Sequence, residues 1–153
     1  MTNSPSSASS PNSRLLAAPL APPYEDVALR VRYSETDAMG VAHNRVYYVW
    51  FELARTEFCR RKGLTYREIE ERGVFLVVAE SFCRYRRPLR YDDPFVVRIA
   101  LRELRPRKAV FHYEIRTPDG DGVYAVGYTV HVAIDKTGAV AAMPPDMIAQ
   151  LGR

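Results

Sequence analysis

A carboxylate, a glycine and the start of a predicted helix fall close together within Val31–Thr56, VRYSETDAMGVAHNRVYYVWFELART. The carboxylate of Asp37 can attack a carbonyl carbon or activate a water molecule against it. Backbone N–H groups at a helix start, here around His43 to Val46, lack intrahelical partners and can stabilise an oxyanion. Gly40 would let the chain turn tightly between the two groups. This arrangement suits attack on an activated carbonyl such as a thioester.

Each of these residues also has a purely structural explanation. An aspartate in a turn-rich segment commonly accepts hydrogen bonds from its own turn or caps a helix, and Asp37 taken alone fits that role. Asn44 suits the N-cap of the following helix, while its backbone N–H stays available to a substrate oxygen. His43 could orient the substrate or Asp37, and is equally well explained as a packed, hydrogen-bonded side chain.

A helix is predicted from Val46 to Lys62, and it would position these amides. Its last turn contains three basic residues, which suit the negative end of the helix dipole, and Gly63 is placed to end it. The first half is apolar on almost every face, so we expect the helix to be buried.

Alternation of apolar and polar residues predicts five strands around this helix. The expected strands are 27–31, 75–85, 95–101, 109–115 and 124–134, with a short helical turn at 66–72. Turn signals such as RYDDP and TPDGDG separate them. One antiparallel sheet and one long central helix make a two-layer α+β domain.

The chain of 153 residues, 47% of them hydrophobic, has room for one domain, which we assign to residues 24–153. Residues 1–23 are rich in Ser, Pro and Ala and cannot bury enough apolar surface to fold, so they are predicted to form a disordered tail. No apolar run approaches the roughly 20 residues needed to cross a bilayer, so no membrane span is expected. The apolar stretch Leu15–Ala21 is broken by proline and follows no basic segment, which favours a cytoplasmic location over export.

The basic residues are clustered, and the formal net charge is +4. Such clusters suit a phosphorylated ligand, nucleic acid or simply a solvated face. Because no helix-turn-helix, ribonucleoprotein or Gly-x-x-Gly signature is present, nucleic acid is not expected as a partner.

Cysteines and histidines give no sign of a metal site. Cys59 and Cys83 belong to no CxxC or Cys/His cluster and are interpreted as two unpaired thiols. His112 and His131 lie on predicted strands without a carboxylate at ligand spacing. We therefore expect neither a metal nor a disulfide.

The segment around Asp37 resembles the amino-terminal signature of the 4-hydroxybenzoyl-CoA thioesterase family and its Tol-Pal-associated acyl-CoA thioesterase relatives. The resemblance continues through 79–93 and 127–144 and covers nearly all of the chain after residue 23. The matching residues of the signature are Glu35, Thr36, Asp37, Met39, Gly40, Val41, His43, Tyr47, Trp50, Phe51, Glu52, Ala54, Arg55 and Thr56.

This resemblance implies a single hotdog domain, with an antiparallel sheet of about five strands wrapped around one long central helix. It also implies an acyl-CoA thioesterase that releases a free acid and CoA, needs no cofactor beyond the CoA of its substrate, and forms a dimer or homotetramer with active sites between subunits. The family's catalytic aspartate falls on Asp37. The other expected site residues are His43 and Asn44 beside it and Gly40, Val41 and Tyr47 against the substrate. The basic clusters, rather than the resemblance, supply candidates for the CoA phosphates: Arg84, Arg87 and Arg107, with Arg105 and Lys108 as alternatives from the same group.

The chain departs from the family pattern at one place. Many relatives carry His seven residues after the Asp and Asn nine after it, whereas Asn44 and Val46 stand there in this chain and His43 lies one position earlier. A non-hydrolytic acyl-thioester binding or regulatory module is therefore the main alternative, and a hotdog hydratase or dehydratase ranks third.

Overall fold

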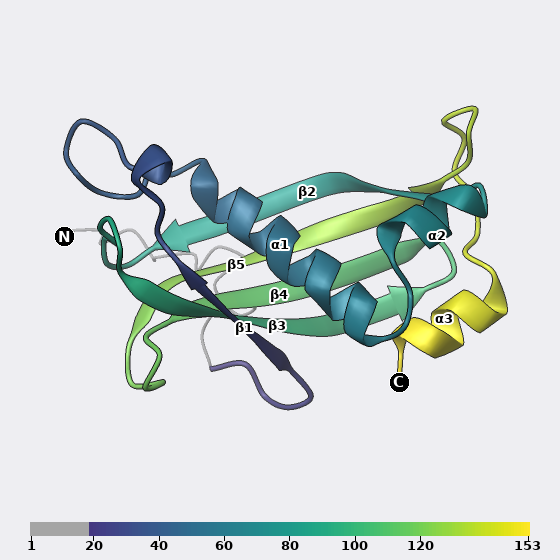
Figure 1. Ribbon diagram of the computed structural model, residues 1–153. Coiled ribbons are helices and arrows are strands. Elements are labelled where there is room, and N and C mark those ends of the chain that lie inside the picture. The colour runs from purple at the N-terminus through teal and green to yellow at the C-terminus, as the bar shows by residue number, and fades with distance from the viewer. Residues whose placement is uncertain (1–18) are drawn as a thin grey trace, which may run out of the picture.

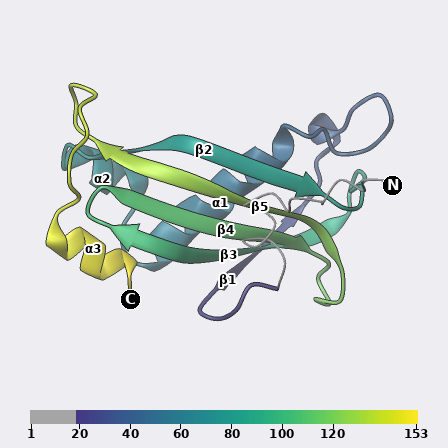
Figure 2. The same cartoon turned by 180° about the vertical axis from the view of Figure 1, so that it is seen from behind.

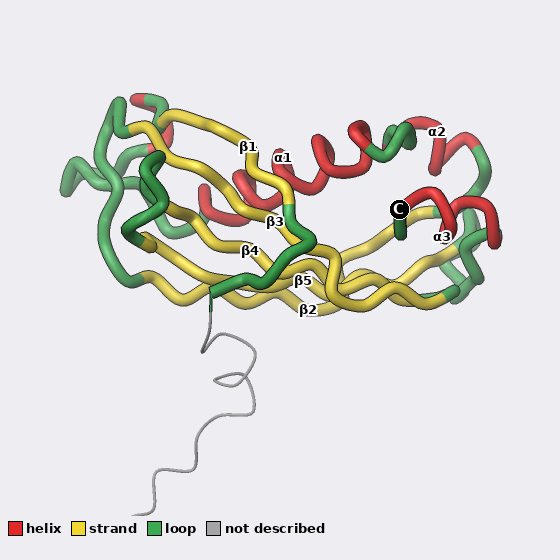
Figure 3. The backbone as a smooth tube through the Cα atoms, turned by 90° about the horizontal axis from the view of Figure 1, so that it is seen from below, coloured by secondary structure: helices red, strands yellow, loops and turns green. Residues whose placement is uncertain are grey.

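The computed structural model describes residues 19–153, which form a five-stranded antiparallel sheet with the helix α1 packed across one face (Figure 1). The strand order is β1-β3-β4-β5-β2. Figure 2 shows the sheet from behind, and Figure 3 shows α1 on one side of it only. The elements are β1 (Glu25–Arg30), a 3-10 turn (Tyr33–Glu35), α1 (Val46–Arg61), α2 (Tyr66–Glu71), β2 (Phe75–Tyr85), β3 (Pro94–Arg105), β4 (Lys108–Arg116), β5 (Val123–Ile134) and α3 (Pro145–Leu151).

Aromatic residues at helical spacing attach α1 to the sheet. Trp50 packs on Phe95 of β3 with ring centroids 4.4 Å apart, and Phe51 stacks on Tyr113 of β4 at 4.2 Å. Two turns further on, Phe58 packs edge to face with Phe111. Each of these large apolar side chains contributes on the order of 1.5–3 kcal/mol when fully buried. The hotdog fold expected from the sequence is confirmed.

A glycine on β5 allows this close packing. A Cβ atom added to Gly127 would lie 2.8 Å from the Phe51 ring and 2.4 Å from the carbonyl oxygen of Phe82. No side chain fits there, so Gly127 fixes how near α1 can approach the sheet.

The expectation that α1 is buried on most faces is wrong for the single chain. Tyr48, Val49 and Leu53 are 37%, 44% and 42% exposed. They lie on the side of the helix that the sheet does not cover. The long edge strand β2 is also exposed along most of its length, with Val78 51% exposed.

Most element boundaries agree with the sequence pattern to within two residues, and three features differ. β3 continues to Arg105, four residues past its predicted end at residue 101. The helix begins after Arg45, which occupies the N-cap position, so the N-cap predicted at Asn44 is wrong by one residue. The C-terminal helix α3 was not predicted. No helix in the described part of the chain is long and apolar enough to cross a membrane.

The predicted disordered tail lies mainly outside the described residues. The described part of it runs along the sheet face opposite α1, where Leu20 N–H donates to Glu114 at 2.6 Å and Arg102 donates to the carbonyl oxygen of Ala21.

Candidate functional site

The carboxylate of Asp37 is held by the tight turn that it begins. Its Oδ1 accepts hydrogen bonds from the N–H groups of Met39 at 2.8 Å and Val41 at 3.4 Å. The backbone closes the turn through Asp37 N–H to Val41 O and Gly40 N–H to Asp37 O. Gly40 has φ of +75°, a conformation that glycine adopts without strain. Oδ2 has no hydrogen-bond partner among the described residues, so one carboxylate oxygen stays free.

The same turn occurs a second time, at Asp135. There Oδ1 accepts from the N–H groups of Thr137 and Ala139, and Gly138 has φ of +86°. The backbone hydrogen bonds are also equivalent, because Asp135 N–H donates to Ala139 O and Gly138 N–H to Asp135 O. The Asx-turn explanation of Asp37 is therefore correct as far as Oδ1 is concerned. What distinguishes Asp37 is its position beside the start of α1.

One amide near the start of α1 is free to bind a substrate oxygen. Of the four N–H groups from His43 to Val46, three have partners: His43 N–H donates to Glu35 O, Arg45 N–H to the ring Nδ1 of His43, and Val46 N–H to His43 O. The N–H of Asn44 has no partner among the described residues. This N–H lies at the positive end of the α1 dipole, where a developing negative charge is stabilised.

His43 takes a defined tautomer through this contact. Because its Nδ1 accepts a hydrogen bond at 3.2 Å, the neutral ring carries its proton on Nε2. The ring is thus a potential donor at Nε2.

Two tyrosines hold this segment against the sheet. The hydroxyl of Tyr85 donates to the carbonyl oxygen of Asn44 at 3.0 Å, and its ring meets the edge of Tyr47 at 4.8 Å. Burial raises the pKa of Tyr47 to about 12, and burial also raises that of Tyr85, so both phenols stay protonated near neutral pH. The backbone around the free amide is therefore fixed from the sheet side.

These groups surround an open pocket of about 390 Å³. Its lining comes from the Asp37 turn, the start of α1 and the end of β2. The residues are Asp37, Val41, Ala42, His43, Asn44, Tyr47, Tyr85, Arg86, Arg87 and Pro88.

Six of the nine predicted site residues line this pocket, and Gly40 lies in the turn that forms its wall. Arg84 does not line it, because its guanidinium lies over the Phe82 ring at 5.8 Å. Arg107 sits in the β3–β4 turn, at the end of the sheet away from Tyr85. The single chain therefore does not bring Arg84 and Arg107 to Asp37.

Sequence reasoning missed Tyr85 and Arg86. Both line the pocket because the segment that follows β2 pairs with the end of the Asp37 turn, through the bridge between Val41 and Arg90 and the hydrogen bond from Ala42 N–H to Leu89 O. The run Arg86–Arg87 was visible as a basic cluster, but nothing in the pattern showed which of its side chains would face the turn. Both side chains are exposed, and the guanidinium of Arg87 lies over the ring of Tyr124 at 4.9 Å.

The neighbouring carboxylate has a structural role. Glu35 is 5% exposed and accepts hydrogen bonds from the backbone and guanidinium of Arg32 and from Nε1 of Trp50. Its oxygens are fully used, so Asp37 is the carboxylate available at this pocket. Within residues 19–153, no cluster of three or more His, Cys, Asp or Glu side chains could hold a metal ion.

Comparison with known proteins identifies the family. A family model described as the thioesterase-like superfamily matches residues 31–151. A putative esterase of Aquifex aeolicus is 35% identical over 119 residues, which cover 78% of this chain and 91% of that protein. The putative acyl-CoA thioesterase YneP of Bacillus subtilis is 32% identical over 108 residues, which cover 71% and 78% of the two chains.

Solved structures agree with the sequence relatives. A hypothetical protein from Thermus thermophilus superposes with a TM-score of 0.78 at 36% identity, covering 84% of this chain and 95% of that one. The DHNA-CoA thioesterase from Staphylococcus aureus superposes with a TM-score of 0.79 at 26% identity, covering 84% and 89%. With a matching sequence model, a shared fold and a carboxylate beside a helix start, the chain belongs to the thioesterase-like superfamily of hotdog enzymes.

Proposed function

We propose that the protein hydrolyses acyl-CoA thioesters to a free acid and CoA, with Asp37 as the catalytic carboxylate. The observation that carries this proposal is the free Oδ2 of Asp37, held by a rigid turn in the same pocket as the unpartnered N–H of Asn44. A carboxylate and an oxyanion donor in one open pocket are the two groups that thioester hydrolysis needs. The names of the relatives YneP and DHNA-CoA thioesterase support the same class of substrate.

In this mechanism the thioester carbonyl lies between Asp37 and the start of α1. Asp37 either removes a proton from a water molecule that attacks the carbonyl carbon, or attacks that carbon itself to form a mixed anhydride that water then cleaves. The N–H of Asn44 donates to the oxyanion while the C–S bond breaks. CoA leaves as the thiolate and takes up a proton, and the acyl group leaves as the acid.

Arg86 and Arg87 are the cations that line this pocket, and we propose that they bind phosphate groups of CoA. Arg86 is exposed and therefore free to move toward a ligand. The phosphate contacts predicted for Arg84 and Arg107 stay predictions, since neither residue lines the pocket of the single chain.

We further propose that two copies of the chain associate through β2 and the uncovered side of α1. β2 has 11 residues and, within residues 19–153, pairs only with β5, so its other edge presents N–H and C=O groups without a strand partner in that part of the chain. Exposed apolar residues lie on both surfaces, among them Val77 and Val78 on β2 and Val49 and Leu53 on α1. An antiparallel pairing of β2 with its own copy is self-complementary about a two-fold axis. The homotetramer expected from the family would combine two such dimers.

We also propose a cytoplasmic location and hydrolysis without a cofactor. Cys59 and Cys83 are both free thiols, as a reducing compartment favours. Cell fractionation tests the first proposal, and activity retained after dialysis against EDTA tests the second.

Thiol release from a panel of short, long and aromatic acyl-CoAs tests the activity. Hydrolysis predicts steady release of CoA thiol with at least one member of the panel. Acyl-CoA binding without release from any member would contradict the enzyme and favour a non-hydrolytic binding module.

A further inference from the structure

The peptide unit that joins Asn44 to Arg45 is held at both of its polar ends. Its carbonyl oxygen accepts a hydrogen bond from the hydroxyl of Tyr85 at 3.0 Å, and its N–H donates to Nδ1 of His43 at 3.2 Å. Because a peptide unit is planar, two such contacts fix its orientation. The orientation of this unit is therefore set by two side chains, one from β2 and one from the segment before α1.

The preceding peptide unit, between His43 and Asn44, carries the free amide. Its carbonyl oxygen accepts a hydrogen bond from Val46 N–H at 3.0 Å. In a trans peptide unit the N–H and C=O groups point in opposite directions, so the N–H of Asn44 points away from α1. On the other side, the N–H of His43 donates to the carbonyl oxygen of Glu35 at 2.8 Å. The free amide thus lies between backbone groups that are already hydrogen-bonded.

Tyr85 is itself held in place by the sheet and by a second aromatic ring. It is the last residue of β2, where its backbone pairs with Ala125 of β5, and its ring packs against the edge of buried Tyr47 at 4.8 Å. Within residues 19–153, its hydroxyl is the one donor to the carbonyl oxygen of Asn44. Removing this hydroxyl would release the carbonyl group and leave the aromatic packing intact.

His43 makes a contact that aspartates make elsewhere in the chain. At Asp37, Asp119 and Asp135, a side-chain oxygen accepts the N–H of the residue two positions later, and His43 does the same through its ring Nδ1. Asparagine forms this turn through its Oδ1. His43→Asn should therefore keep the contact with Arg45 N–H while removing Nε2, which separates a positioning role from proton transfer at Nε2.

We propose that Tyr85 and His43 are positioning residues for the proposed thioester hydrolysis, on which this inference rests. By holding the Asn44–Arg45 peptide unit, they keep the N–H of Asn44 in the direction that the developing oxyanion requires. A donor that is ordered before the reaction stabilises the transition state more than one that must be ordered during it. Because these contacts act on the oxyanion donor and not on the CoA group, their loss should lower kcat and leave KM unchanged.

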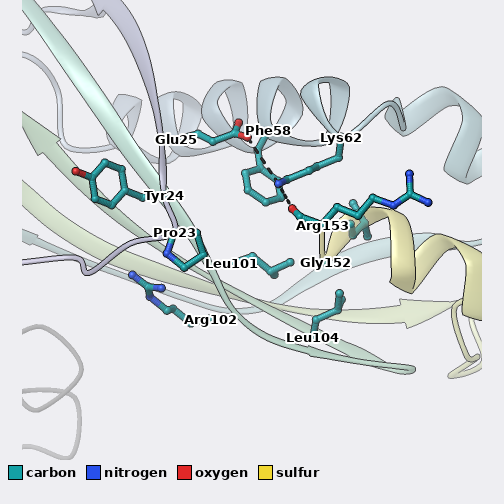
Figure 4. Close-up of a pocket in the computed structure, with 11 residues that line it drawn as sticks. Pro23, Tyr24, Glu25, Phe58, Lys62, Leu101, Arg102, Leu104, Gly152 and Arg153 are labelled. Atoms are coloured by element: carbon teal, nitrogen blue, oxygen red, sulfur yellow. Dashed lines mark hydrogen bonds and ion pairs between the residues drawn. The ribbon is translucent and has the colours of Figure 1, made fainter.

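The first kinetic test removes the hydroxyl of Tyr85. Tyr85→Phe should lower kcat for the best acyl-CoA about 10-fold and keep KM within about 2-fold. Tyr128→Phe is the matched control, because it also removes a phenol hydrogen bond to β2, the one to Glu80. Tyr24→Phe is a second control, at the cavity beside the other end of α1 (Figure 4). Both controls should keep the wild-type kcat, and an unchanged kcat in Tyr85→Phe would contradict the proposal.

The second kinetic test compares two substitutions of His43. His43→Leu should lower kcat about 10-fold, and His43→Asn should restore it to within about 3-fold of the wild-type value. An equal loss in both variants would assign His43 a role through Nε2 and overturn the positioning role.

NMR relaxation of the Asn44 and Arg45 amides tests the two contacts without reference to hydrolysis. The order parameters should be near the rigid-backbone value of about 0.85 in the wild type and in His43→Asn, and should fall by about 0.1 or more in Tyr85→Phe and His43→Leu. Circular dichroism checks that each variant is folded. Unchanged order parameters in Tyr85→Phe would overturn the positioning role whatever the protein hydrolyses. No CoA release by the wild type would instead overturn the proposed function, and with it the catalytic consequence, even where the order parameters fall as expected.

Discussion

At the scale of single residues, the two oxygens of Asp37 divide between the turn that the structure shows and the chemistry that we propose. Its Oδ1 accepts two backbone hydrogen bonds within the turn, the same number that Oδ1 of Asp135 accepts from backbone N–H groups. Its Oδ2 has no hydrogen-bond partner among the described residues. The sequence identified the residue through its resemblance to a family signature. The local pattern alone could not separate the two roles, because D-x-x-G forms the same turn at both places.

Burial of His131 predicts a pH dependence of stability. The ring is fully buried and bonded to Thr129 at 2.8 Å, and burial, together with the nearby charge of Arg55, lowers its pKa to about 4. The unfolded chain binds this proton near pH 6.5. Below pH 6.5 the unfolded chain binds a proton at His131 that the folded chain does not bind. The free energy of unfolding therefore keeps its full value above pH 6.5 and falls as the pH is lowered from 6.5 toward 4.

Urea unfolding at pH 7.5 and pH 5 should show a loss of about 2 kcal/mol through this residue. Burial also lowers the pKa of His112, which adds a loss of the same sign. A folded His131→Gln variant should lose less stability than the wild type over the same interval. An identical loss in the variant would show that His131 is not the group responsible.

At the scale of elements, the contact between Gly127 and Phe51 fixes the position of α1. Gly127→Ala should lower the free energy of unfolding by roughly 1–3 kcal/mol, because the added methyl group overlaps the Phe51 ring and a backbone oxygen. Gly152→Ala is the matched control, since its nearest contact is 3.3 Å and its φ is −85°. Urea denaturation of both variants measures the difference, and equal stabilities would contradict this packing role.

The sequence predicted regular elements well where the pattern was long. β2 was predicted with its observed bounds, and α1 to within one residue at its end, because both contain many periodic apolar positions. The seven-residue helix α3 was missed, since Met147 and Leu151 alone mark its buried face. Elements this short depend on tertiary packing more than on their own sequence.

The sequence did not correctly predict which basic residues from distant segments lie together at the site, and the reason is the topology of the sheet. Arg107 was grouped with Arg87 because both belong to basic clusters. The antiparallel register, which pairs Arg105 with Lys108 at one end of the sheet and Tyr85 with Ala125 at the other, separates them. Sequence alone does not contain that register.

At the scale of the whole molecule, the exposed apolar surface of β2 and α1 predicts self-association. The wild-type protein should have at least the mass of a dimer by light scattering at micromolar concentration. Val78→Lys places a charge on this surface and should shift the protein toward the monomer while circular dichroism stays unchanged. Val140→Lys is the control, because Val140 is 61% exposed and belongs to neither β2 nor α1. A monomeric wild type, or a Val78→Lys variant with unchanged mass, would contradict the proposed interface.

The measurement that tests the central claim most directly compares Asp37→Asn with Asp135→Asn in CoA thiol release from the best acyl-CoA substrate. Asparagine keeps the Oδ1 acceptor of both turns and removes the negative charge, so both variants should fold with similar stability. Loss of the catalytic carboxylate should lower kcat by about 100-fold or more in Asp37→Asn, and Asp135→Asn should keep the wild-type rate. Wild-type turnover by a folded Asp37→Asn variant, or an equal loss in both variants, would contradict the role assigned to Asp37.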